Sequence, residues 1–452
     1  MRAVTCALAL LYALIAAEGS FQQARAGDGP AQPYAGDLLT RSTLTGDWGG
    51  ARDNWAAKGV TFDATLTQIE QGVVSGGKNG SWEYGGRGDL TANLDTQKLG
   101  LWPGGFVTVE LEGNWSNSVN LKTGAINAVN SSQLYPLPSG DNVALPNLSM
   151  AQFISRYAGV LVGKLQTIRT SDLNEFAQGK GDTEFFNLAL NFNPAVLMVP
   201  YSTLGAGAIV LPTANPDQAI ISAMVLSATG KASTDGFDDF NGAIFAGEGR
   251  VRTEFFDRTG HQLIGGLYSN RSYTSIDQRV EFEPLQRQLG LAQPLMLVKH
   301  DGTWAVYYNF DQFLYETDKN AGNGFGLFGR FAASAGNPVP SQYFYSIGFG
   351  GKGMIPGRSF DRFGIGYYYD SIRNPTLQTR LFGTRAFLHD EWGFEAFYNV
   401  ALTPWLMLTP DIQVIGPAQK RTLPRFLGGP GPLLGSSIGT ATVLGVRLQL
   451  VL

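Results

Sequence analysis

Cysteine and histidine are nearly absent from this 452-residue sequence. The single cysteine, Cys6, lies in an N-terminal apolar stretch, so the remainder of the chain can form neither disulfide bonds nor thiolate metal sites. The three histidines, His261, His300 and His389, are far apart in the sequence and lack the spacing of metal ligands. Phosphate-binding loops, nucleophile elbows and zinc motifs are missing as well. The sequence therefore predicts that the protein is not an enzyme and uses no metal or cofactor.

Long apolar runs are missing beyond residue 26, which leaves no candidate for a transmembrane helix. Before that point, Arg2, an apolar run from Ala7 to Ala17 and the sequence Ala24-Arg25-Ala26 predict a secretory signal peptide over residues 1–26. An uncleaved membrane anchor would need roughly 20 apolar residues, more than this run provides. An excess of positive charge is also missing, since 33 Lys and Arg residues stand against 37 Asp and Glu residues. This balance gives no support for nucleic-acid binding.

Glycine, with 58 residues, and aromatic residues, at 12%, are abundant instead, and they occur where apolar and polar side chains alternate. Between Glu391 and Leu402 the even positions are apolar, whereas the odd positions carry the polar residues. A period of two puts these two sets on opposite faces of a β-strand. Thr403-Pro404 interrupts the pattern, which resumes from Leu406 to Val414, so the segment predicts a hairpin.

Aromatic residues mark the ends of the apolar face of this hairpin, at Trp392, Tyr398 and Trp405. Amphipathic rings at the rims of an apolar band are typical of a bilayer interface. A secreted chain with no membrane helix and many alternating segments predicts an all-β fold, a transmembrane antiparallel β-barrel of the outer membrane of a Gram-negative bacterium. The chain length fits about 16 strands of ~10 residues with alternating short and long links, although about 14 or about 18 strands would also fit.

The alternating pattern predicts further strands along the chain, at Val60–Thr67, Tyr84–Asp95, Val107–Trp115, Gly159–Gln166, Phe185–Phe192, Ala219–Ala228, Ala243–Phe255, Leu263–Ser272, Thr303–Asp311, Phe325–Ala333, Tyr343–Phe349, Phe363–Tyr369 and Thr442–Leu452. The alternation is weaker between residues 151 and 228, so the strand boundaries stay open there. The segment Ser116–Ser149 is rich in Asn, Ser and Pro and too long for a turn, which predicts an extracellular loop.

Residues 27–59 are predicted to form an N-terminal lead-in with a short helix, and residues 60–452 the barrel. Trp48, Arg52 and Trp55 have helical spacing, and Gly59 can end such a helix. We expect this helix to lie in the periplasm against the barrel mouth; an irregular linker is the alternative.

Loop lengths predict the orientation of the barrel, because the short turns of such barrels face the periplasm and the long loops face outward. The tight turn at Thr403-Pro404 is then periplasmic, and the segment Gly416–Gly439 is extracellular. The last strand consequently descends to a periplasmic C-terminus.

Charged side chains share the polar faces of the predicted strands, and strand parity assigns them to the lumen: Arg87, Asp89, Glu110, Glu112, Arg250, Arg252, Glu254, Arg330 and Glu395. The polar segment Ser171–Thr183 could fold inward and add Asp172, Glu175 and Lys180 to a constriction, or it could be a solvated surface loop. A pore needs many weak polar contacts, because solutes must leave as easily as they enter. Each charge could hold the wall together or contact a substrate, but the mixture of signs favours neutral solutes over ions.

Five segments resemble one known family, the carbohydrate-selective porins of the OprB type. They are LTGDWGGAR (Leu44–Arg52), GKLQTIRTSDLNEFAQGKGDTEFFNLALNFNP (Gly163–Pro194), WAVYYNFDQFLY (Trp304–Tyr315), GGKGMIPGRSFDRFGIGYYY (Gly350–Tyr369) and FYNVALTPWLMLTPDIQ (Phe397–Gln413). The resemblance spans nearly the whole chain in order, and it implies a 16-stranded barrel with inward-folded loops and diffusion of sugars across the outer membrane. The C-terminal Leu452 departs from the terminal Phe of such barrels, which bears on assembly more than on function.

These observations predict a porin for passive, carbohydrate-selective diffusion of mono- or oligosaccharides into the periplasm. The alternatives are an outer-membrane channel for polysaccharide export, which should carry excess lumen arginine, and a general diffusion porin. The expected partners besides sugars are outer-membrane lipid and the barrel-assembly machinery, and the sequence leaves open whether the barrels associate as homo-oligomers such as trimers.

Overall fold

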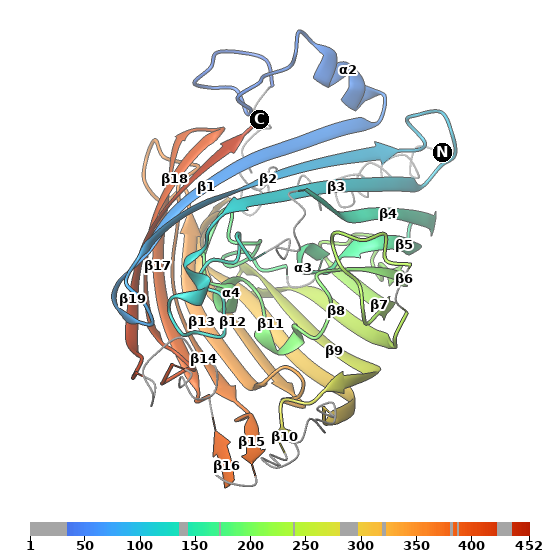
Figure 1. Cartoon of the computed structure of the whole chain (residues 1–452). Coiled ribbons are helices and arrows are strands. Elements are labelled where there is room, and N and C mark those ends of the chain that lie inside the picture. Colours follow the sequence, from blue (N-terminus) through green and yellow to red (C-terminus); the bar gives the residue numbers. More distant parts are fainter. Residues whose placement is uncertain are drawn as a thin grey trace.

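The computed structural model describes residues 34–134, 143–170, 173–237, 240–280, 297–318, 322–379, 383–386, 388–422 and 436–452. Within these residues, sixteen antiparallel strands close into a barrel (Figure 1). The all-β barrel predicted from the alternating segments is therefore confirmed. None of the helices in the described part of the chain is long and apolar enough to cross a membrane. The predicted signal peptide, residues 1–26, lies outside the described residues.

The strands follow one another in chain order around the barrel, and β1 (Val60–Gly77) closes it by pairing with β19 (Gly439–Val451). Between them lie β2 (Trp82–Asp95), β3 (Gly105–Ser116), β4 (Ala144–Ser155), β5 (Ala158–Gln166), β6 (Ser202–Val210), β7 (Ala219–Ser227), β8 (Ala243–Phe255), β9 (Arg258–Thr274), β11 (Lys299–Asp318), β12 (Asn323–Ser334), β13 (Ser341–Lys352), β14 (Arg362–Ile372), β17 (Glu391–Thr403) and β18 (Leu406–Gly416). A small separate sheet contains β10 (Gln278–Val280), β15 (Thr376–Thr379) and β16 (Gly383–Ala386).

The period-two alternation fixes which face of the wall each side chain occupies. On β17, Glu391 and Glu395 are fully buried inside the barrel, whereas Phe394 between them is half-buried on the outer surface. Strand β18 pairs in matching register, so that Glu395 lies opposite Gln413 and Phe394 lies opposite Val414. The predicted hairpin is confirmed, and its apolar side chains face outward. A closed barrel also satisfies every strand's backbone polar groups, which hydrocarbon cannot do.

Three features of the middle of the chain differ from the sequence-based expectation. The segment Phe185–Phe192 is not a strand but a turn that leads into the short helix α4 (Leu188–Asn191) inside the barrel. Apolar side chains in a short run are buried in either case, so the pattern alone could not separate the two. The predicted loop Ser116–Ser149 ends earlier, because β4, a strand that the pattern did not predict, starts at Ala144. The pattern also misses β6, whose sequence STLGAGAIV consists mostly of small residues.

Antiparallel pairing puts alternate connections at opposite ends of the barrel. The two-residue links that follow β4, β8 and β17 share one end with α2 (Ala51–Ala57) and the C-terminus (Figure 1). The strands β10, β15 and β16 of the small sheet, which belong to the connections after β9 and β14, lie at the other end. This arrangement agrees with the predicted orientation, in which the short turns and the C-terminus are periplasmic.

The predicted N-terminal helix is confirmed as α2, and the buried Arg52 fixes it to the seam where the barrel closes. The Arg52 guanidinium donates to the Phe62 carbonyl oxygen on β1 at 2.8 Å and to the Leu452 carbonyl oxygen at 3.1 Å. It also donates to Thr43 Oγ1 at 3.0 Å and lies 4.4 Å from the centre of the Tyr34 ring. One side chain therefore holds the lead-in, the first strand and the C-terminus together.

A first prediction follows from this closed, fully paired wall. Folded protein should migrate differently from boiled protein on SDS gels, because detergent alone does not open a barrel without free strand edges. Far-UV circular dichroism should be dominated by strand. A mostly helical spectrum, or one migration position with and without boiling, would contradict the barrel.

Candidate functional site

Two connections turn back into the barrel and fill part of its interior. The segment 117–134 contains η1 (Val119–Leu121), and the segment 173–199 contains α4 and η2 (Pro194–Val196), just after the short helix α3 (Thr167–Thr170). Figure 1 shows α3 and α4 surrounded by the wall. Phe185 and Leu190 of the second segment are fully buried against inward-facing Phe328 and Phe344 of β12 and β13. This part of the inward segment is therefore packed against β12 and β13 like a protein core.

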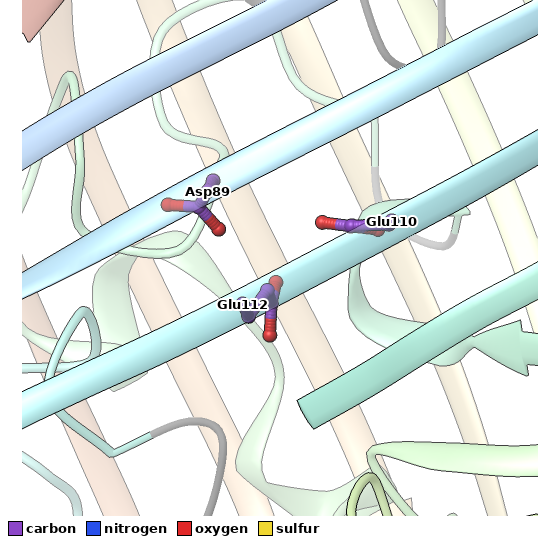
Figure 2. A group of neighbouring side chains, drawn as sticks. All are labelled: Asp89, Glu110 and Glu112. Carbon is purple, nitrogen blue, oxygen red and sulfur yellow. The ribbon is translucent and has the colours of Figure 1, made fainter. Parts of the chain in front are cut away.

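On β2 and β3, three acidic side chains meet inside the barrel: Asp89, Glu110 and Glu112 (Figure 2). Period-two alternation puts Glu110 and Glu112 on the same face of β3, and the strand register sets Asp89 directly opposite Glu112. Arg87 Nε donates to Asp89 Oδ2 at 2.9 Å, and its Nη2 donates to Glu112 Oε1 at 2.5 Å. The fold thus brings together four residues that the sequence assigned to the lumen, and all of them are buried.

A second cation reaches this cluster from the inward segment. Lys180 Nζ donates to Asp89 Oδ1 and to Glu110 Oε1, each at 3.3 Å, and also to Glu112. Its side chain is only 1% exposed. Opposite charges gain most when water is excluded and each has several partners. Lys180 therefore ties the inward segment to the wall at β2 and β3, which confirms that residues 173–183 fold into the barrel.

Two neutral groups complete the cluster. Gln166 Nε2 donates to Glu110 Oε1 and Glu112 Oε1, each at 3.1 Å, and the Tyr201 hydroxyl donates to Glu112. The oxygens of the three carboxylates lie within 4.8 Å of one another, a spacing that a metal ion could use. However, Arg87 and Lys180 already occupy these oxygens and compensate their charge. The donor set therefore fits a self-contained ion-pair network better than a metal site.

Arg330 and Glu395 also hold the inward segment in place. Arg330 is fully buried and donates to the carbonyl oxygens of Leu190, at 2.7 Å, and Ala177. Glu395 accepts the backbone N–H groups of Phe186 at 2.5 Å and Asn187 at 2.9 Å. Both residues face inward as predicted, but their partners belong to the chain itself.

The inward face of β8 carries a separate row of charges. Arg250, which is 8% exposed, borders a cavity, whereas Arg252 Nη1 donates to Asp217 Oδ2 at 2.6 Å. Partial burial acts to raise the pKa of Asp217, but the hydrogen bond from Arg252 and the nearby positive charges hold it below its ordinary value. Glu248 accepts a hydrogen bond from the Tyr307 hydroxyl at 2.8 Å. Glu254, two residues beyond Arg252, is exposed near the end of the strand.

The cavity beside β8 has a volume of about 210 Å³. It extends from Glu110 and Gln166 of the cluster region to Asp217 in the link between β6 and β7, and it is bounded by β3 to β9, β11 and the inward segment. Among the predicted lumen residues, Glu110 and Arg250 line it. The cavity is an open space between this part of the wall and the inward segment.

Of the two predicted acidic residues of the inward segment, Glu175 and Asp172, the structure describes only the first. Glu175 is partly buried, and its backbone N–H donates to Asp311 Oδ2 at 3.2 Å. Asp172 lies outside the described residues. The sequence reasoning did not single out the pair of His261 and Asp311, joined by an Nδ1 to Oδ1 contact of 2.7 Å. Parity alone could have placed both residues inside the barrel, but not side by side.

Glu391 was a further omission among the site candidates. It accepts the backbone N–H groups of Ile126 at 2.7 Å and Asn127 at 3.2 Å, so it holds the first inward segment, 117–134, against the wall. Its position on the polar face of β17 was evident, but nothing in the sequence indicated its partner.

Comparisons with known proteins agree with this architecture. A family model described as carbohydrate-selective porin, OprB family, matches residues 80–452. The high-pH structure of OprB from Pseudomonas putida is similar over 91% of this chain and 98% of its own, with 18% sequence identity and a TM-score of 0.71. The low-pH structure of the same protein covers the same shares at 17% identity and a TM-score of 0.52. A search of curated protein sequences returned no significant match.

The structural likeness establishes the fold, and the family model, which covers most of the chain, establishes the family and its function. The barrel is an outer-membrane channel of a Gram-negative bacterium, and its substrates are sugars. The chain belongs to the OprB family of carbohydrate-selective porins.

Proposed function

We propose that neutral mono- and oligosaccharides cross this barrel passively along the cavity between β8 and the inward segment. The cavity supports this route, because it is open space between β3 to β9 and residues Phe192, Val196 and Val199 of the inward segment. Of the predicted charges, we assign Glu110, Arg250, Arg252 and Glu254 to this path. Arg87, Asp89, Glu112, Glu175, Arg330 and Glu395 instead position the inward segment that narrows it.

The polar groups along this route suit hydroxylated, uncharged solutes. Glu248 and Arg250 offer an acceptor and a donor of opposite charge on the same strand face, and Tyr307 lies beside them. Sugar hydroxyls can bond to both kinds of group, whereas an ion would be attracted by one and repelled by the other. This favours sugar uptake over the export of an anionic polymer, for which an excess of arginine would be expected, and the filled interior argues against an unselective pore.

The remaining expectations form part of the same proposal. The protein carries no catalytic activity. Its outer wall contacts outer-membrane lipid, and the barrel-assembly machinery inserts it into the membrane. Association of several barrels is compatible with a wall whose strands are all paired within one chain.

Liposome swelling tests the proposed function directly. Proteoliposomes that contain the folded protein should swell in glucose and more slowly in sucrose, and an anionic sugar of similar size should enter more slowly than glucose. Swelling at the same rate in all three would point to a general diffusion pore, and no swelling would exclude sugar diffusion.

The charge balance of the path leads to a second prediction. Arg250→Ala removes a donor beside the cavity and leaves the carboxylate of Glu248 to dominate the local field, so cation permeation should rise relative to anion permeation. Glucose flux should change by only about twofold, because a pore spreads its contacts over many groups. The reversal potential of single channels in a salt gradient measures the first effect.

Arg250→Lys is the matched control, since it keeps the charge and should keep the reversal potential. If Arg250→Ala leaves the reversal potential unchanged even at low salt, where screening is weakest, Arg250 does not border the permeation path.

A further inference from the structure

One continuous row of apolar residues crosses the inner wall beside the cavity. Strand pairing connects Phe106 of β3, Ala151 of β4 and Leu161 of β5 as direct neighbours, one on each strand. The row continues through Gly207 of β6 and Met224 of β7. All five residues of this part of the row are apolar or glycine.

The same row continues on the next three strands as Ala246, Leu267 and Ala305. It starts at the second residue of β3, near the end of the barrel that carries α2, and reaches the seventh residue of β11. Because barrel strands tilt relative to the axis, a row of direct neighbours climbs the wall as it goes round. The row is therefore an apolar track that runs along the direction of transport as well as around the lumen.

Every residue of the track except Ala305 lines the cavity, and its most accessible part lies at Leu161 and Met224, because Phe106, Ala151 and Leu267 are buried. Leu161 and Met224 are half-buried. The next residues along the two strands, Val162 and Val225, are 52% and 48% exposed on the outer surface. Leu161 and Met224 therefore point inward. Gly207 lies between Leu161 and Met224, and a Cβ there would come within 2.8 Å of Met224 Cγ. The absent side chain makes room for the Met224 side chain, which packs over Gly207.

Polar groups lie beside the track, at the next inward-facing positions of the same strands. Two residues along β7 and β8, Ser222 lies opposite Glu248, and Tyr307 donates its hydroxyl to Glu248 at 2.8 Å. Phe192 and Val196 of the inward segment also line the cavity and add further apolar surface. The passage is thus apolar along one stripe and hydrogen-bonding along the next.

We propose that this passage selects solutes that combine sugar hydroxyls with an apolar group, such as alkyl or aryl glycosides and deoxy sugars. The apolar group lies on the track while the hydroxyls bond to the neighbouring polar stripe. Removal of apolar surface from water favours entry, and the partial exposure of Leu161 and Met224 keeps each contact weak enough for release. The inference rests on the proposed sugar path and specifies the substrate class that this path prefers.

The test compares phenyl β-glucoside with glucose in liposome swelling at low solute concentration. Leu161→Asn with Met224→Gln keeps the side-chain sizes and makes the track polar. The ratio of phenyl glucoside flux to glucose flux should fall by about threefold to tenfold relative to wild type, because the polar side chains no longer remove the phenyl ring's apolar surface from water. Glucose flux itself should change by less than about twofold. Leu161→Met with Met224→Leu keeps the track apolar and should preserve the ratio.

If pore width alone selected the solutes, the polar variant would leave the ratio unchanged, because its side chains have the same size. An unchanged or increased ratio in Leu161→Asn with Met224→Gln would overturn the proposal while glucose uptake still supports the sugar path. A wild-type protein that passes neither solute would overturn the sugar path and the track together. Heat-modifiable migration of both double variants confirms that they are folded.

Discussion

Replacing Lys180 by methionine should detach the inward segment from β2 and β3 and give a wider, less stable channel. Lys180 is one of two cations among Asp89, Glu110 and Glu112, and its removal leaves Arg87 alone against three buried carboxylates. Breaking a buried ion pair from one side costs about 3–5 kcal/mol, because the remaining charges stay desolvated without a partner. Single-channel conductance should rise, cation preference should increase, and the unfolding midpoint should fall.

Two further variants serve as controls for Lys180→Met. Lys180→Arg keeps the charge and should retain most of the stability. Lys180→Met combined with Glu112→Gln removes one charge of each sign, so the double variant should lose less stability than the sum of the two single changes. If Lys180→Met has wild-type conductance and the wild-type midpoint, the lysine does not hold the segment in the membrane-inserted protein.

The other large effect is expected on the outer wall. Ile347 lies near the middle of β13 with 52% of its surface exposed on the outside, where the bilayer core contacts the barrel. Ile347→Arg should reduce the yield of folded protein strongly, since an arginine on the lipid face near the midplane costs roughly 2–4 kcal/mol. The yield is read as the heat-modifiable fraction after refolding into lipid vesicles.

Tyr343→Arg is the depth control for this change. Tyr343 lies on the same face of the same strand but only two residues from its start, where the polar headgroups are closer. The cost there should be only about 0–1 kcal/mol. Equal folded yields for the two variants would show that Ile347 does not face the hydrocarbon.

The barrel itself could be predicted from local sequence, because its determinants are local. Alternation with period two needs only neighbouring residues to reveal which side chains share a face, and it placed Arg87, Arg250 and Glu395 inside the barrel correctly. Strand β6 could not be predicted in this way, because its alanines and glycines give little difference in polarity between the two faces. The run Phe185–Phe192 misleads it for the opposite reason, since all of its apolar residues are buried.

The composition of the lumen could be predicted only in part. The charges expected there are present, but they do not form the uniform polar surface that their mixed signs suggested. Arg87, Asp89 and Glu112 are neutralised by one another and by Lys180, which lies 70 residues from Glu110 and 68 residues from Glu112 in the sequence. Leu161 and Met224 make part of the transport path apolar, because strand register aligns them across Gly207.

The sequence by itself determined that this chain spans the outer membrane as a barrel and belongs with the sugar porins, since both conclusions depend on periodicity, composition or motifs within short segments. Tertiary structure alone decided which charges hold the inward segment and which border the path. Those roles depend on contacts between residues far apart in the chain, such as Glu395 with Phe186 and Arg330 with Leu190. Side-chain parity gives a residue its face of the wall, but only the folded loops determine what lies opposite.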